Sequence, residues 1–188
     1  ERHMRQFGRD FDTVTRAAGA TFCAPLRWRE PKYIFVCSWS DFFIRQADKW
    51  REGAWSIMQQ ANWHIYMILT KRPGLMAWWA EHHDWPEHIW AGVTVESAKY
   101  TPRLDVLARV SAKVRFVSCE PLLEPLDLRL WLYPFGHEPG DCQWVIIGGE
   151  SGPHARPMNP EWVRDIVEQC QAAGGVPCFV KQASGLRP

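Results

Sequence analysis

The chain has 188 residues, of which 46% are apolar and 23% charged, and its formal net charge is +1. This is the composition of an ordinary globular protein, long enough for one domain over residues 1–188 and short for two. The small net charge gives no electrostatic indication of a nucleic-acid or membrane surface. No apolar run approaches the roughly 20 residues of a membrane helix and no signal peptide opens the chain, so we expect a cytoplasmic protein without a membrane partner.

Six apolar runs predict buried β-strands. Unbroken apolar segments of this length are typical of strands that are covered on both faces, as in a parallel sheet. The runs cover residues 33–37, 64–69, 89–93, 114–118, 144–147 and 177–180.

Helical patterns alternate with these runs. Thr101 and Asn159 are each followed by a proline, which suits the first turn of a helix, and we expect both to be N-caps. Two weaker signals predict a helix near 11–18, ended by Gly19, and a short helical piece near 127–132. The main predicted helices cover residues 51–61, 73–81, 102–110 and 160–173.

This alternation predicts right-handed βαβ units and a parallel sheet. About six βα units of similar length favour an α/β fold of the barrel type, a partial or closed TIM-like β/α barrel, over a doubly wound sheet. In either fold the ligand site lies at the carboxyl ends of the strands.

Polar residues follow every predicted strand and would meet at that end of the sheet. Serines, threonines and carboxylates are common where helices begin, but cations are disfavoured there. The cations therefore indicate an anionic ligand group, a carboxylate or a phosphate. The residues at this position are Ser38, Ser40, Asp41, Thr70, Lys71, Arg72, Thr94, Glu96, Cys119, Glu120, Glu150, Ser151, Lys181 and Gln182.

The six cysteines are scattered without a C-x-x-C pair, so local spacing predicts neither a zinc nor an iron–sulfur site and no metal ligands in this chain. Cys37 and Cys178 lie in apolar runs and Cys170 lies on the apolar side of a predicted helix, so we expect these thiols to be buried. Cys119 at a strand end is a candidate for a reactive thiol or for a buried structural one.

Six segments in this order together resemble a phage-associated family of uncharacterised radical-SAM-like proteins, which carries a three-cysteine motif near the N-terminus. The segments are Ile34–Asp41, Leu69–Pro73, Gly92–Glu96, Arg115–Leu122, Gly148–Gly152 and Phe179–Gln182. The resemblance covers about residues 25–182. The cysteine motif itself is absent from this chain.

The resemblance implies a radical-SAM type of barrel that binds a [4Fe–4S] cluster and S-adenosylmethionine and abstracts hydrogen from a substrate, with cluster ligands that are not in this chain. The substrate, a small molecule, nucleotide or nucleic acid, is not indicated. Glu120, Glu150 and Lys181 are the candidate catalytic residues. Candidates for cofactor binding are Ser38, Asp41, Glu96, Gly148, Gly149 and Glu150, and candidates for substrate binding are Trp39, Lys71, Arg72 and Gln182.

Two other functions fit the same residues. A metal-free barrel lyase would use Lys71 or Lys181 to form a Schiff base with a carbonyl substrate. A non-catalytic barrel would bind a ligand or partner and would tolerate replacement of Glu120 and Glu150 by alanine.

Overall fold

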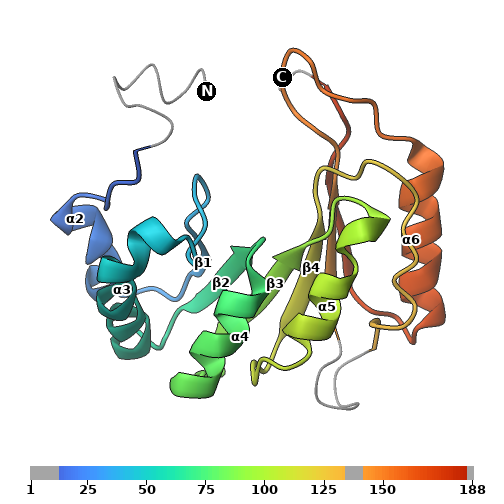
Figure 1. Ribbon diagram of the computed structural model, residues 1–188. Coiled ribbons are helices and arrows are strands. Elements are labelled where there is room, and N and C mark those ends of the chain that lie inside the picture. Colours follow the sequence, from blue (N-terminus) through green and yellow to red (C-terminus); the bar gives the residue numbers. More distant parts are fainter. Residues whose placement is uncertain (1–12, 134–141, 186–188) are drawn as a thin grey trace.

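The computed structural model describes residues 13–133 and 142–185 and shows an α/β fold built on one six-stranded sheet (Figure 1). Every neighbouring pair of strands is parallel, and their order in the sheet is β1-β2-β3-β4-β5-β6. The six predicted strands and the parallel sheet are therefore confirmed, but the expected burial of the first and last strands is wrong, because β1 and β6 lie at the edges of the sheet and contain no buried residue. The strands are β1 (Tyr33–Val36), β2 (Ile65–Thr70), β3 (Ile89–Thr94), β4 (Arg115–Cys119), β5 (Trp144–Gly148) and β6 (Cys178–Gln182).

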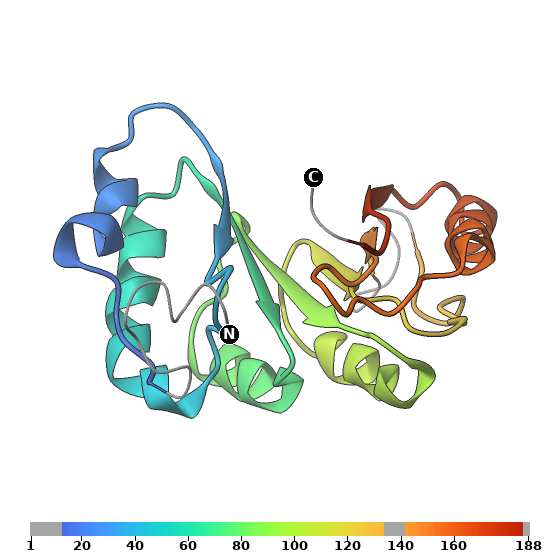
Figure 2. The same cartoon turned by 90° about the horizontal axis from the view of Figure 1, so that it is seen from above.

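The sheet forms a half-barrel. Its strand order follows the chain without the reversal that defines a doubly wound sheet, so each crossover adds the next strand on the same side. Seen from above, the helices lie around the outside and the concave side of the sheet is open (Figure 2). Within the described residues β1 pairs only with β2 and β6 only with β5, which leaves both edges of the half-barrel unpaired.

The four main predicted helices are confirmed, although α5 is shorter than expected. They are α3 (Asp48–Gln60), α4 (Pro73–His82), α5 (Pro102–Leu107) and α6 (Pro160–Ala172). Asn159 caps α6 as predicted, because its side chain accepts a hydrogen bond from the amide of Glu161 at 3.0 Å. The short elements are α2 (Gly19–Phe22), η1 (Ala24–Arg27), η2 (Arg45–Ala47) and η3 (Ala98–Tyr100). None of the helices in the described part of the chain is long and apolar enough to span a membrane.

Three local predictions are wrong. Of the helix predicted near 11–18, residues 11 and 12 lie outside the described residues and residues 13–18 are not helical. The extended angles of Ala18 (φ −52°, ψ 149°) show that Gly19 begins helix α2 and does not end a helix. Residues 127–132 form an irregular segment and a turn, because the backbone there bonds to α6. Thr101 is not a side-chain cap, since it follows η3 directly and its hydroxyl donates to the carbonyl of Ala98.

The turn at 127–132 is held by one buried glutamine. The amide oxygen of Gln169 on α6 accepts from the backbone amide of Leu128 at 2.7 Å. Its amide nitrogen donates to the carbonyl of Leu126 at 2.8 Å. Gln169 thus satisfies backbone groups at the start of this segment, while the amide of Trp131 bonds to the carbonyl of Leu128 in a turn.

The main core lies between the sheet and the outer helices, and strand alternation decides which residues enter it. In β3, Ile89, Ala91 and Val93 are fully buried in this core. The alternate residue Gly92 faces the ring of Phe116 on the next strand, and a Cβ at position 92 would lie 2.4 Å from that ring. Only glycine leaves room for this ring.

Candidate functional site

A hollow of about 630 Å³ lies on the concave side of the sheet at the carboxyl ends of the strands. This is the position at which the sequence predicts a ligand site. Four of the predicted site residues line it: Ser38, Trp39, Glu120 and Lys181. Ser38 and Trp39 belong to the turn after β1, and the Trp39 side chain is 72% exposed.

Glu120 and Lys181, which both line the hollow, form an ion pair with each other. The Nζ of Lys181 on β6 donates to the Oε1 of Glu120, just after β4, at 2.8 Å. The Lys181 side chain is 43% exposed and the Glu120 side chain is 23% exposed, so both remain in contact with solvent. A ligand that carries both an amino and a carboxylate group can therefore exchange partners with this pair without leaving a buried charge unpaired.

Six lining residues are not among the sequence candidates. Most are apolar or aromatic, and they occupy the strand positions that face away from the core. They are Phe35, Met67, Ser118, Trp144, Ile146 and Phe179. The signal that finds them is strand alternation, since residues two apart on one strand, such as Trp144 and Ile146, face the same side.

The two glycines after the fifth strand make room for protein atoms. A Cβ at Gly148 would lie 3.0 Å from the Cδ of Glu120, so this glycine leaves space for the paired carboxylate. A Cβ at Gly149 would lie 2.3 Å from the backbone nitrogen of Ser184. Gly148 therefore supports the hollow, whereas Gly149 allows the chains that follow β5 and β6 to approach each other.

Glu150 and Gln182 lie outside the hollow. The Glu150 carboxylate forms two hydrogen bonds with the guanidinium of Arg156, at 2.7 and 2.9 Å, and a third with the Arg156 amide. These bonds lower the pKa of Glu150 to about 2. The side-chain amide of Gln182 donates to the carbonyl of Gly149, which fastens β6 to β5. Neither Glu150 nor Gln182 therefore lines the hollow with Glu120 and Lys181.

Asp41 and Arg72 form a second ion pair, which joins the turn after β1 to the end of β2. The Oδ2 of Asp41 accepts from Arg72 at 2.7 Å and from the amide of Lys71 at 3.1 Å. Its Oδ1 accepts from the hydroxyl of Thr70 and from the amide of Phe43, both at 2.8 Å. With four donors, this carboxylate acts as a structural bridge between two loops.

The Glu96 carboxylate forms ion pairs with two cations. Its carboxylate accepts from Lys71 and, at 2.8 Å, from Arg103 on α5. Arg103 also lies over the ring of Tyr100, 4.0 Å from the ring centroid. Lys71 and Arg72, which indicated an anionic ligand in the sequence, thus have carboxylates of the protein as partners. Sequence reasoning missed Arg103, because nothing in its helix shows that it reaches back to β3.

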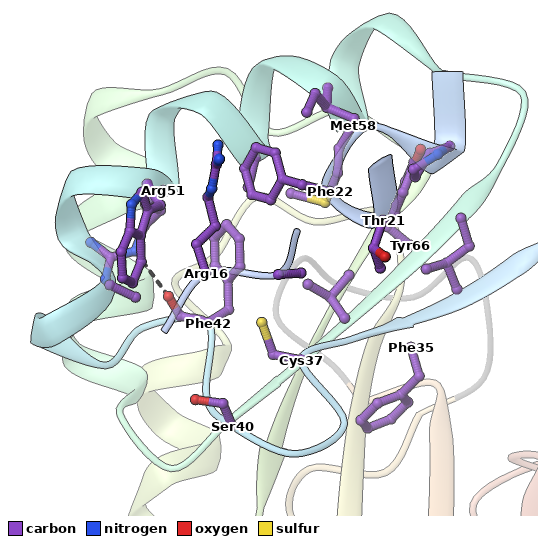
Figure 3. Close-up of a pocket in the computed structure, with 18 of the residues that line it drawn as sticks. Arg16, Thr21, Phe22, Phe35, Cys37, Ser40, Phe42, Arg51, Met58 and Tyr66 are labelled. Atoms are coloured by element: carbon purple, nitrogen blue, oxygen red, sulfur yellow. Dashed lines mark hydrogen bonds between the residues drawn. The ribbon is translucent and has the colours of Figure 1, made fainter. Parts of the chain in front are cut away.

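A separate hollow of about 370 Å³ lies between β1 and helices α2 and α3 (Figure 3). Phe22, Phe42, Met58 and Tyr66 are among its largely apolar lining, and the sulfur of Cys37 points toward them. Phe35 points to the other side of β1, where it lines the concave hollow. The core-side hollow therefore offers mostly apolar surface.

Arg51 is the charged group buried beside this core-side hollow. Its guanidinium donates to the carbonyls of Phe42 and Ile44, both at 3.0 Å, and forms an ion pair with Asp48. The charge of Arg51 is therefore satisfied within the protein, and the concave hollow, with its accessible ion pair, is the better candidate for a ligand site.

The cysteines do not gather into a metal site in the described ranges. Cys170 is buried as predicted. The predicted burial of Cys178 and Cys37 is wrong, because Cys178 is half-buried and Cys37 is exposed. Burial of its thiol, together with the nearby Asp41 carboxylate, raises the pKa of Cys37. Cys119 is fully buried and burial raises its pKa, so it is a structural thiol and not a reactive one. Across residues 13–133 and 142–185, no group of three His, Cys, Asp or Glu side chains is arranged to hold a metal ion.

A family model described as "Protein of unknown function (DUF5131)" matches residues 2–188. The chain belongs to the DUF5131 family. Neither the search of curated proteins nor the search of solved structures found a match. Membership in DUF5131 assigns no reaction, so a function has to be argued from the half-barrel and its concave hollow.

Proposed function

We propose that the chain is a radical-SAM-like enzyme and that it binds S-adenosylmethionine in the concave hollow. The observation that carries this proposal is the Glu120–Lys181 pair at the edge of an aromatic-lined hollow of about 630 Å³. Small-molecule sites typically have this form, with an apolar lining and a few polar groups that fix orientation. A partial β/α barrel of sequential strands, expected from the resemblance, is compatible with the half-barrel fold.

The chemical groups of S-adenosylmethionine match the lining of the hollow. Its amino group suits the carboxylate of Glu120, and its carboxylate suits the ammonium of Lys181. Its adenine is a flat ring that stacks on aromatic side chains, and Trp39 presents an exposed ring beside the pair. The protein's contribution is thus to bind and orient the cofactor in a largely apolar site.

The described residues do not fit the iron–sulfur cluster. A [4Fe–4S] cluster is held by three or more cysteine thiolates, whereas Cys119, Cys142 and Cys170 are buried and no described group of three His, Cys, Asp or Glu side chains could hold a metal ion. What residues 13–133 and 142–185 offer is therefore a binding surface for S-adenosylmethionine and substrate.

The lyase alternative has less support. A lysine that forms a Schiff base reacts as the free amine. Both candidate lysines instead donate to carboxylates, Lys71 to Glu96 and Lys181 to Glu120.

Binding of S-adenosylmethionine to the purified protein tests the proposal, with calorimetry as the measurement. We expect Glu120→Gln and Lys181→Met to weaken binding about tenfold each, since each removes one charge-assisted hydrogen bond. The matched control is the double variant Glu87→Gln/Lys113→Met, which removes an exposed ion pair of the same type far from the hollow. Equal affinity in Glu120→Gln and the control would contradict the proposed site.

The reaction class needs a separate measurement. It is anaerobic reconstitution of the protein with iron and sulfide, read by absorbance and iron content, followed by an assay for deoxyadenosine released from S-adenosylmethionine on reduction. A bound cluster together with release of deoxyadenosine would support the radical-SAM class. A protein that binds S-adenosylmethionine but neither holds iron nor releases deoxyadenosine would support the non-catalytic binding function instead.

A further inference from the structure

The concave face holds a second hollow near the amino ends of the strands, which we call the lower hollow. It has a volume of about 430 Å³ and is lined mainly by Tyr33, Met67, Trp90, Gln143 and Trp144. Met67 and Trp144 also line the hollow with the Glu120–Lys181 pair. The two hollows are therefore adjacent parts of one surface, which runs along the strands.

The floor of the lower hollow is a row of aromatic rings from alternate strands. The ring centroids of Tyr33 on β1 and Trp90 on β3 are 5.8 Å apart, with an angle of 67° between the rings. Trp90 and Trp144 on β5 are 6.0 Å apart at 81°. Each ring thus packs edge to face against the next, and the rings hold one another in place.

This arrangement distinguishes between two kinds of ligand. Aromatic cages for alkylammonium groups surround the cation with ring faces. Here successive rings already touch each other, so no ammonium group fits between them. What remains is a continuous surface of ring faces and edges, on which a flat group can lie.

The charges of the lining point to the same kind of ligand. Every side chain that lines the lower hollow is uncharged. The carbonyl oxygen of the Gln143 side chain accepts from the amide of Arg115 at 2.7 Å, so it serves the sheet itself. An ionic group would lose its hydration here without gaining a partner, whereas an uncharged ring would lose little.

We propose that the lower hollow is a subsite for a flat, uncharged ring of the substrate, such as a nucleobase or an indole. That this ring belongs to the substrate of the enzyme rests on the proposed function. Binding of the ring itself rests only on the aromatic row. The chemical class that follows is a substrate with a heteroaromatic ring, held next to the Glu120–Lys181 pair.

Ligand-observed NMR with three small probes tests this subsite on the whole protein. Indole is flat and uncharged, cyclohexanol is uncharged but not flat, and tetramethylammonium is a cation. We expect indole to bind best and tetramethylammonium not to bind. The variant Tyr33→Ala should weaken indole binding about tenfold, as removal of one stacking ring does for base binding.

The variants are chosen so that weaker binding cannot be caused by unfolding of the protein. Tyr33 is 70% exposed on an edge strand, so its replacement leaves the core intact. Trp90→Ala removes the central ring and serves as the second variant, with circular dichroism to check its fold. Trp78→Ala is the matched control, since Trp78 is 52% exposed on α4, on the outside of the sheet.

The possible results separate the two proposals. Weaker indole binding in Tyr33→Ala, with normal binding in Trp78→Ala, supports the subsite even if S-adenosylmethionine does not bind. Equal indole binding in all variants overturns the subsite, whatever happens at Glu120. Stronger binding of tetramethylammonium than of indole also overturns it, because the site would then be a cation cage.

Discussion

Glu120 and Gly148 face each other across β4 and β5, and the Cδ of Glu120 lies 3.0 Å from where a Cβ at residue 148 would be. The variant Gly148→Ala should displace the carboxylate by a few tenths of an ångström and disturb its bond to Lys181. We expect weaker binding of S-adenosylmethionine with little change in the melting temperature, because the Glu120 side chain can move. Calorimetry and thermal unfolding measure the two effects. Gly74→Ala in α4, where an added Cβ meets nothing within 4 Å, should leave the binding of S-adenosylmethionine unchanged.

Asp41 is predicted to affect stability and not binding of the cofactor. Asp41→Asn places an amide group among four hydrogen-bond donors, so at least one donor loses its acceptor. We expect a loss of about 1–3 kcal/mol in the free energy of unfolding, the usual cost of an unsatisfied polar group. Urea unfolding measures it. A normal unfolding curve together with lost binding of S-adenosylmethionine would mean that Asp41 contacts the ligand.

Gly92 is predicted to be essential for packing on the concave side. Gly92→Ala forces an added methyl group into the Phe116 ring, which is fully buried. Overpacking of this kind typically costs about 1–3 kcal/mol, and chemical denaturation measures it. Gly53→Ala in the middle of α3 is the control, because an added Cβ there makes only ordinary contacts at 3.8 Å with Phe22. The control should stabilise the protein by about 0.5–1 kcal/mol.

The Glu150–Arg156 pair predicts a titration at unusually low pH. Arg156 lowers the pKa of Glu150 to about 2 in the folded protein, so the carboxylate should remain mostly ionised at pH 3. Because the folded pKa lies below the ordinary value, the pair stabilises the folded state above about pH 4.3 and loses this effect as the pH falls toward about 2. NMR titration of the side-chain carboxyl carbon measures the midpoint. Arg156→Gln should return it toward the ordinary value, and an unchanged midpoint would exclude Arg156 as the cause.

The sheet could be predicted from the sequence because its strands are largely apolar runs and each ends in polar or turn residues. The run Trp144–Gly148 is apolar at almost every position because alternate residues pack against the helices on one face and line the concave hollow on the other. The helix α6 was predictable for a related reason, since Asn159 and Pro160 mark its start. The segment 127–132 was not, because contacts with a distant part of the chain, those of Gln169, hold its backbone.

The site could be predicted only in part. Position at a strand end selected Glu120 and Lys181, which the structure places together in the lining of the concave hollow, since parallel strands bring their carboxyl ends together. It did not show that Lys71 and Arg72 pair with carboxylates from other strands, because pairing between loops depends on side-chain reach. Glu150 follows the strand end closely in sequence, but its carboxylate is bonded to Arg156 and does not line the hollow.

The unpaired edges of β1 and β6 have a consequence for the size of the ligand. A closed barrel admits molecules only through its end, which limits them to what fits the mouth. Here the wall of the half-barrel is missing on one side in the described residues, so a ring can reach the aromatic row from the flank while it remains attached to a much larger body. Because access is from the side, the ring can belong to a polymer as well as to a free small molecule.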